Sequence, residues 1–289
     1  MHDATVAQRP LWLRILQHPL VRLVLIGGPL FLMMALTSYF TAKVPGEPLK
    51  AIGIVIVWAA LGIAVYLGLV RLIERRRPAE LSLSRSGREL GIGAAVGAGL
   101  YTVCVLILMV LGIYRIDGLN PWSYMLPAVA MALSSGILEE LVFRAVLFRV
   151  VEEWLGSWVS LAVSSLVFGF VHLINPAATV LGAVFISVEA GLLLAAAYML
   201  TRRLWMSIGF HIAWNYTQSG IFSGIVSGGD TDPGLLKSNI DGPVLLTGGT
   251  FGLEASLTAF VLCTATGIVL LVLAIRRGHL MRPFGRKPA

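Results

Sequence analysis

Long apolar stretches, separated by short clusters of basic and turn-forming residues, run along almost the whole chain. Most of them approach the ~20 residues that an α-helix needs to cross the hydrocarbon core of a bilayer. The pattern predicts about eight such helices, at 23–42, 51–72, 90–114, 121–150, 160–174, 177–200, 204–222 and 254–275. No hydrophilic stretch is long enough to form a separate soluble domain. We therefore expect an all-α, polytopic membrane helix bundle.

The connections divide the chain into an N-terminal tail, a first group of three helices, a core of four helices, a polar loop, and a last helix with a basic tail. These parts correspond to 1–22, 23–119, 120–222, 223–253 and 254–289. The third helix contains several glycines, which favour close packing against another helix. The two cysteines, Cys104 and Cys263, both fall within apolar spans, where we interpret them as small buried residues.

Two connections have a composition that suggests a location. The segment after the fourth helix contains acidic and tryptophan side chains and predicts an amphipathic connector at the membrane interface: Glu152, Glu153, Trp154 and Trp158. The loop 223–249 is rich in Gly and Asp, which favours a solvated connector, although it could also offer a surface to a partner.

Composition and charge restrict the possible classes of protein. The chain is 57% hydrophobic and only 13% charged, whereas soluble domains carry roughly 25% charged residues. The net charge of +7 could suggest a nucleic-acid partner, but the basic residues lie in short clusters between spans. Threading the spans alternately places 17 of the 22 Lys and Arg on the side of the N-terminus and four on the other side. This bias predicts an integral membrane protein, which we expect in a bacterial inner membrane, with both termini cytoplasmic and without a nucleic-acid partner.

The fourth helix contains three charged residues in an otherwise apolar stretch, Glu139, Glu140 and Arg144. A charge at the centre of a bilayer costs about 2.5–3.5 kcal/mol on insertion scales, so such groups must be neutralised or used. Residues four apart share a helix face, which pairs Glu140 with Arg144. Glu139 points about 100° away and is left without this partner, which suits a general base. Alternatively, both acids simply form a polar network with Arg144.

Two later spans contain histidines, and each has a notable neighbour one helical turn away. Phe168 precedes His172 by four residues and could fix its ring by packing. His211 precedes Asn215 by four residues, and Asn is a neutral donor that can hold an oxyanion. At ~1.5 Å per residue, Glu139 and the two histidines lie roughly 12–18 Å from the basic edge of the membrane. We therefore expect one site that faces the cytoplasm.

These motifs resemble those of the CAAX prenyl endopeptidases and bacteriocin-processing enzymes, usually called the CPBP or type II CAAX protease family. The family pattern is EExxxR, then FxxxH, then HxxxN or HxxxD on successive helices. Here Glu139–Arg144 is EELVFR, Phe168–His172 is FGFVH, and His211–Asn215 is HIAWN, in the same order. The resemblance covers about 124–216, and three separate motifs agree in order and spacing.

The resemblance implies hydrolysis of a peptide bond in a membrane-associated or prenylated peptide. The implied catalytic residues are Glu139 as the base that activates water, His172 as its helper, and His211 and Asn215 as stabilisers of the tetrahedral oxyanion. It also implies that Glu140 and Arg144 hold the site together. The eukaryotic relatives cut after a prenylated cysteine, but nothing in this sequence indicates a prenyl groove.

The need for a metal stays open at this point. Glu139, His172 and His211 could form a three-ligand zinc site with one open position. The same residues could also act without metal, through water activated by the glutamate. The His-Glu-x-x-His motif of many zinc proteases does not occur in the sequence.

Two other classes of function compete with the protease hypothesis. A non-enzymatic membrane scaffold or a bacteriocin-immunity protein could keep the same polar cluster for binding. A proton-coupled transporter could use Glu and His as a proton relay, and would need access from both sides. Glu189, in the middle of the sixth span, could line a substrate path or polarise His211, or could form an interhelical hydrogen bond.

Overall fold

The computed structural model describes residues 10–230 and 232–285, so the predicted basic tail residues Arg286 and Lys287 lie outside the described part. The α-helices are α1 (Leu11–Leu16), α2 (Pro19–Arg22), α3 (Gly28–Thr41), α4 (Pro48–Leu69), α5 (Ser86–Val110), α6 (Leu126–Ser134), α7 (Arg149–Leu155), α8 (Ser157–Val171), α9 (Val180–Ile186), α10 (Leu192–Thr201), α11 (Trp205–Tyr216), α12 (Val244–Thr247) and α13 (Leu257–Arg276). Stretches of π-helix and 3-10 helix join several of them into longer rods. The predicted all-α architecture is confirmed.

Within the described residues, seven rods are long and apolar enough to cross a membrane: Pro19–Thr41, Pro48–Glu74, Ser86–Val110, Trp122–Leu155, Ser157–Ile174, Val180–Thr201 and Leu257–Arg276. An eighth rod is shorter. It consists of α11, which has 12 residues, and the five-residue π-helical stretch Thr217–Ile221. The eight rods correspond to the eight predicted spans.

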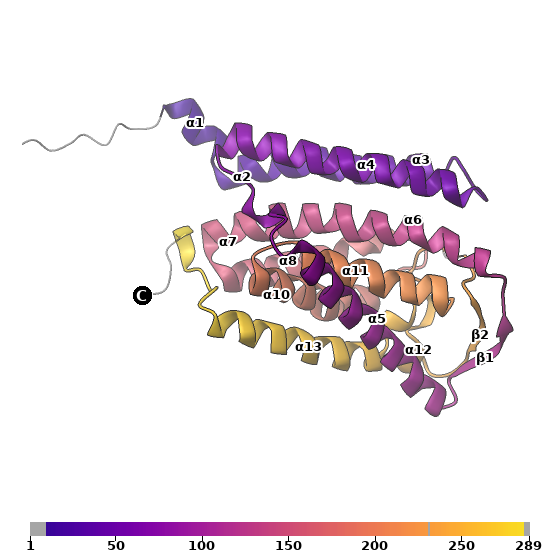
Figure 1. The fold of residues 1–289 in the computed structure, drawn as a ribbon. Coiled ribbons are helices and arrows are strands. Elements are labelled where there is room, and N and C mark those ends of the chain that lie inside the picture. Colours follow the sequence, from indigo (N-terminus) through magenta and orange to yellow (C-terminus); the bar gives the residue numbers. More distant parts are fainter. Residues whose placement is uncertain (1–9, 231, 286–289) are drawn as a thin grey trace, which may run out of the picture.

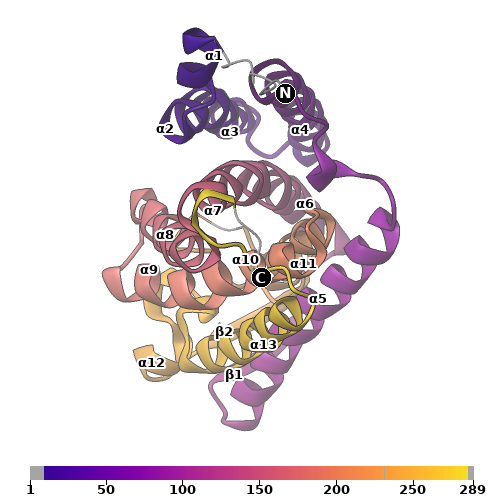
Figure 2. The ribbon, with the colours of Figure 1, turned by 90° about the vertical axis from the view of Figure 1, so that its left-hand side faces the viewer.

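The rods run side by side, and the two ends of the bundle differ (Figure 1). Helix α1 and the short turn Pro283–Gly285 lie at one end, which we call the terminal end. A two-stranded antiparallel sheet lies at the other end, which we call the sheet end; it pairs β1 (Tyr114–Leu119) with β2 (Leu236–Ile240). Seen along the rods, α10 is central, and the α3–α4 hairpin lies at the edge of the bundle beside α6 (Figure 2).

Glycines in α5 allow a close helix contact with α11. A Cβ added at Gly93 would lie 2.1 Å from the carbonyl oxygen of Met206, and one at Gly97 would lie 2.4 Å from that of Phe210. Any side chain at these positions would overlap the backbone of α11. The close packing predicted for the Gly-rich helix is confirmed, and it fixes α11 within the bundle.

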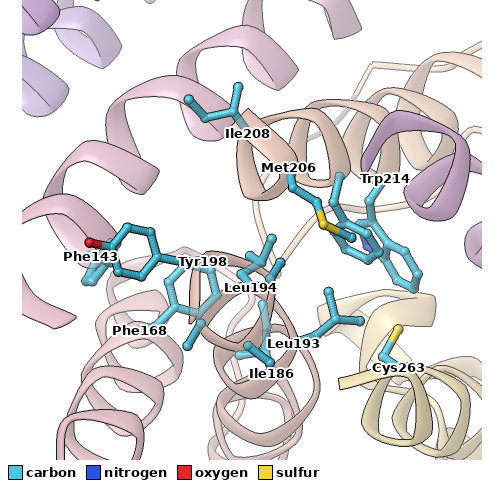
Figure 3. Packing of buried hydrophobic residues seen from close by; sticks show 14 of the residues in the cluster. Phe143, Phe168, Ile186, Leu193, Leu194, Tyr198, Met206, Ile208, Trp214 and Cys263 are labelled. Atoms are coloured by element: carbon cyan, nitrogen blue, oxygen red, sulfur yellow. The ribbon is translucent and has the colours of Figure 1, made fainter. Parts of the chain in front are cut away.

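The apolar core lies around α10, whose side chains are buried from Leu193 to Leu200. A helix that is apolar on all sides belongs in the interior of a bundle. Figure 3 shows Leu193, Leu194 and Tyr198 of this helix among side chains of the neighbouring rods. Phe143 and Phe168 meet edge to face, with their ring centroids 5.2 Å apart, which joins α8 to the long rod Trp122–Leu155.

The predicted amphipathic connector after the fourth span is wrong. Helix α7 continues to Leu155, and Gly156 alone, at φ 84°, turns the chain into α8. Glu152 is buried rather than interfacial, because its carboxylate accepts hydrogen bonds from Ser157 Oγ and from the guanidinium of Arg202. The pairing with a distant arginine allows this acid to face inward, and the local sequence gave no sign of it.

The loop 223–253 is more structured than a solvated connector. Its strand β2 pairs with β1 in the connection that follows α5, although no strand was expected. Another part folds back onto the bundle: Gly228 N–H donates to Phe251 O at 2.8 Å, and Ser227 Oγ donates to the buried carboxylate of Glu254. A polar, Gly-rich composition does not reveal such pairing, because each partner lies far away in the sequence.

An ionic cluster joins the N-terminal rods to the long rod at the terminal end. It consists of three arginines and three glutamates: Arg22, Glu74, Arg76, Glu80, Arg149 and Glu153. Glu74 is the centre, because it accepts from Arg22 at 2.7 Å, Arg76 at 2.6 Å and Arg149 at 2.9 Å. No side-chain atom of these six residues is buried without a hydrogen bond.

Candidate active site

The two adjacent glutamates of the long rod have different surroundings. The side chain of Glu140 is fully buried, whereas that of Glu139 is 18% exposed. One oxygen of Glu140, Oε1, accepts hydrogen bonds from Arg144 Nη1 and from His211 Nδ1, both at 2.9 Å. The predicted pairing of Glu140 with Arg144 is confirmed. Because Arg144 neutralises Glu140, Glu139 is the carboxylate that remains available for chemistry.

The carboxylate of Glu139 faces the imidazole of His211. Glu139 Oε2 lies 4.0 Å from His211 Nε2. The other ring nitrogen, Nδ1, must carry a proton, because its partner Glu140 is a carboxylate that only accepts hydrogen bonds. Gly136 makes the approach of the two helices possible, since a Cβ there would lie 2.3 Å from Ile212 Cγ1. The first and third motifs therefore meet at a site between helices.

The Phe168 ring connects the second motif to Arg144. The guanidinium carbon of Arg144 lies 4.3 Å from the centroid of this ring, a cation–π contact. The predicted packing of Phe168 on His172 is also present, with ring centroids 5.0 Å apart. Nδ1 of His172 donates to the backbone carbonyl of Phe168 at 2.7 Å, so Nε2 is left as an acceptor in the neutral ring. The sequence did not indicate the contact with Arg144.

Asn215 is positioned by a serine that sequence reasoning missed. Asn215 Nδ2 donates to Ser135 Oγ at 2.8 Å, and Ser135 Oγ donates to Met131 O at 3.0 Å. A primary amide carries two N–H groups, so one donor of Asn215 remains for another acceptor. Ser135 precedes Glu139 by four residues in the same rod, and this spacing was the only available signal.

A cavity of about 940 Å³ brings the motif residues together, and Glu139, His172, His211 and Asn215 all line it. Apolar side chains of α3, α4 and α6 form one wall, among them Met34, Val55 and Met131. The connection between α3 and α4 also lines the cavity, together with Val226, Ser227, Gly229 and Asp230, and both segments lie at the sheet end. We expected the site to open at the terminal end. The sequence gives only the distance of each site residue from the end of its helix. It does not show on which side of the site the neighbouring side chains close the path to the surface.

Two further acids line the same cavity. Glu189 is 2% exposed, and its Oε2 has no hydrogen-bond partner in the described part of the chain, so the predicted interhelical hydrogen bond is not seen for that atom. Glu254 lies outside the recognised motifs and had no predicted role. Burial raises the pKa of Glu254, and the hydrogen bond from Ser227 opposes this rise.

The geometry does not favour the zinc alternative. Across residues 10–230 and 232–285, no group of three His, Cys, Asp or Glu side chains is placed to hold a metal ion. The Nδ1 atom of each histidine is engaged by a protein oxygen, which leaves Nε2 as the ring nitrogen that faces the site. In this placement Glu139, His172 and His211 do not form a three-ligand zinc centre, and the steps proposed for this site use no metal.

Comparison with known proteins supports the motif-based resemblance. Residues 121–217 match the model of the family described as type II CAAX prenyl endopeptidase Rce1-like, which confirms the predicted family for this segment. The match contains all three motifs and excludes the rods before residue 121 and after residue 217. Comparisons with curated proteins and with solved structures found no match.

The family and the fold together define the class of protein. The seven long apolar rods show an integral membrane protein. The matched family supports an intramembrane protease that acts on membrane-associated substrates.

Proposed function

We propose that the chain is an intramembrane endopeptidase in which Glu139 activates a water molecule. One observation carries this proposal: Glu139 faces the cavity beside His211, whereas the adjacent Glu140 is buried and neutralised by Arg144. A purely structural cluster would pair both acids. Here the unpaired one lies where a substrate could reach it.

Glu139 would act as general base and then as general acid. Its carboxylate takes a proton from water while the water oxygen attacks the carbonyl carbon of the scissile peptide bond. Nε2 of His172, an acceptor in the neutral ring, helps to orient this water. When the tetrahedral intermediate collapses, Glu139 returns the proton to the leaving amine, and the C–N bond breaks. Glu139 is then a carboxylate again, as it was before the water attacked.

His211 and Asn215 would stabilise the oxyanion of the tetrahedral intermediate. Asn215 offers its second amide N–H, because Ser135 accepts the first. His211 would act through Nε2, because its Nδ1–H donates to Glu140 and this hydrogen bond holds Nε2 on the side of Glu139. Removing one donor of this kind typically lowers kcat by about 10²–10³.

The proposed substrate is a membrane-associated peptide or protein, with or without a prenyl group. The apolar wall of the cavity, formed by rods that lie in the bilayer, suits a substrate that stays in contact with lipid. We place the protein in a bacterial inner membrane with the terminal end in the cytoplasm, because the basic connections gather there.

Mass spectrometry of the products formed from a peptide library tests this function. The full-length protein is reconstituted in liposomes, and the wild type is compared with Glu139→Gln. The variant should cleave about 10²–10⁴-fold more slowly, since general base catalysis contributes this much. Its thermal unfolding in detergent should stay close to that of the wild type, because the side chain is partly exposed and unpaired.

Asp117→Asn serves as the matched control, because Asp117 is an exposed acid in β1 that does not line the cavity. It should cleave at the wild-type rate. The proposal fails if Glu139→Gln cleaves as fast as the control, or if the variant loses its fold in proportion to its activity.

A further inference from the structure

We propose that the cavity opens on the extracytoplasmic side of the membrane, so that substrate reaches Glu139 from outside the cytoplasm. This inference rests on the proposed endopeptidase function. It assigns the substrate class more narrowly: membrane-anchored chains whose scissile bond enters the bilayer from the extracytoplasmic side.

All connections that line the cavity, among the described residues, belong to the sheet end. Apart from the rods themselves, it is lined by the α3–α4 connection, by Ser123 and Tyr124 before α6, by Asn175 after α8, and by Val226, Ser227, Gly229 and Asp230. All of these lie at the end that carries β1 and β2 (Figure 1). Among the described residues, no connection of the terminal end lines the cavity.

The packing between the site and the terminal end is closed. Glu140 and Arg144 are fully buried, Phe168 is 1% exposed and Phe143 is 3% exposed. One layer nearer the terminal end, Phe148 packs on Tyr198 with ring centroids 5.6 Å apart, and both are buried. The ionic cluster around Glu74 follows behind this layer. A peptide could not pass from the terminal end to Glu139 without disrupting these contacts.

His172 lies near the sheet end of its rod. The rod starts at Ser157 at the terminal end, so His172 is 15 residues along it, or about 22 Å. Three residues later, Asn175 donates a hydrogen bond to Ser227 O at 2.8 Å, within the connections of the sheet end. A water held by His172 is therefore close to the surface at this end.

The distribution of basic residues then assigns each end to a side of the membrane. Of the 22 Lys and Arg, three lie outside the described residues and Arg144 lies in the site. Four of the remaining 18 lie in connections of the sheet end, namely Lys43, Lys50, Arg115 and Lys237, which leaves 14 at the terminal end. Connections rich in Lys and Arg remain in the cytoplasm. The sheet end, and with it the mouth of the cavity, is then extracytoplasmic.

Two variants of the full chain, each with one added cysteine, test the direction of access. Ser123→Cys places a thiol at the mouth of the cavity, and Ser84→Cys places one in an exposed connection of the terminal end. A membrane-impermeant maleimide is applied to intact bacterial cells whose cytoplasmic membrane is sealed. The wild-type chain gives the background, because Cys104 and Cys263 are buried.

We expect Ser123→Cys to be labelled in intact cells and Ser84→Cys only after permeabilisation. The opposite pattern overturns the proposal, and so does labelling of both thiols in intact cells. A second measurement separates access from misfolding. A bulky maleimide polymer is attached to each purified variant, and cleavage is compared with that of the same unlabelled variant. The polymer should block cleavage by Ser123→Cys and leave cleavage by Ser84→Cys unchanged. Block at Ser84→Cys alone would also overturn it. If no peptide is cleaved at all while the labelling is as expected, the endopeptidase function fails and the sidedness stands.

Discussion

Two charged clusters lie on the same long rod, with Arg144 in one and Arg149, five residues later, in the other. The cluster at the terminal end contains three arginines and three glutamates, and each of their buried polar side-chain atoms has a partner. The cluster at the site leaves Glu139 Oε2, Glu140 Oε2 and Arg144 Nε buried without hydrogen bonds among the described residues. Both clusters place ionised groups in a helix bundle, yet only one is fully satisfied.

This difference separates a structural use of charge from a chemical one. A buried ion pair with complete hydrogen bonding holds helices in register, whereas an unsatisfied buried polar atom is costly and is expected mainly where function requires it. The terminal cluster joins α2, the end of the α4 rod, and α7. In the site cluster, the unsatisfied carboxylate of Glu139 lines a cavity where a substrate and water could supply the missing partner.

Replacement of Arg144 should have the largest effect, because this residue serves both fold and chemistry. Arg144→Met leaves Glu140 buried with only His211 as a partner, which typically costs about 3–5 kcal/mol of the free energy of unfolding. Cleavage should be lost as well. Adding Glu140→Gln should restore much of the stability without restoring cleavage, since His211 then has no carboxylate. Chemical denaturation in detergent and product mass spectrometry measure the two effects.

The double variant Glu140→Gln/Arg144→Met decides between the two uses of charge. If it regains cleavage together with stability, the site cluster is structural, like the terminal one. A gain in stability alone identifies Glu140 as the group that positions His211.

Replacement of Arg149 should affect stability alone. This side chain bonds to Glu74, Glu153 and the carbonyl oxygen of Ala145. Arg149→Met should lower the free energy of unfolding by on the order of 3 kcal/mol, because Glu74 and Glu153 remain buried or half-buried with fewer partners. Cleavage per folded molecule should change less than about twofold. A drop in the cleavage rate of the folded fraction would show that the two clusters are coupled.

Lowering the pH should reduce the stability of the fold by less than either substitution. Burial alone would raise the pKa of Glu80, but the hydrogen bonds and charge of Arg76 and the charge of Arg149 lower it below the ordinary value of about 4.3. The ionised form therefore stabilises the fold fully above that ordinary value, and this contribution is lost as pH falls through the lowered pKa. Thermal unfolding in detergent from pH 7 to pH 3 should show this loss. Glu80→Gln should make the unfolding temperature depend less steeply on pH. If the dependence on pH is unchanged in this variant, the loss of stability in acid comes from other acidic residues.

The sequence predicted the rods and those contacts that lie within one helix. The pairing of Glu140 with Arg144 and the packing of Phe168 on His172 follow from four-residue spacing, which survives even where the rod is π-helical, at Leu141–Phe148. The glycines of α5 correctly indicated a close helix contact. These features depend on local geometry, which periodicity describes well.

Contacts between helices could not be predicted in the same way. The hydrogen bond from Asn215 to Ser135 and the stacking of Arg144 on Phe168 depend on how three rods are rotated against one another. The strand pairing of β1 with β2 joins segments more than 100 residues apart, with partners such as Tyr114 and Ile240. The direction in which the cavity opens follows from side-chain packing on its closed side, so it emerges only in three dimensions.

The α3–α4 hairpin has a consequence for how such enzymes could diversify. It supplies a wall of the cavity through residues such as Met34 and Val55, yet it precedes the segment 121–217 that carries the family motifs. Under the proposed function, part of the surface that a substrate meets therefore lies outside the segment that carries the motif residues. Exchanging the hairpin for one of different shape should then change which substrates are cleaved while leaving the motif residues in place.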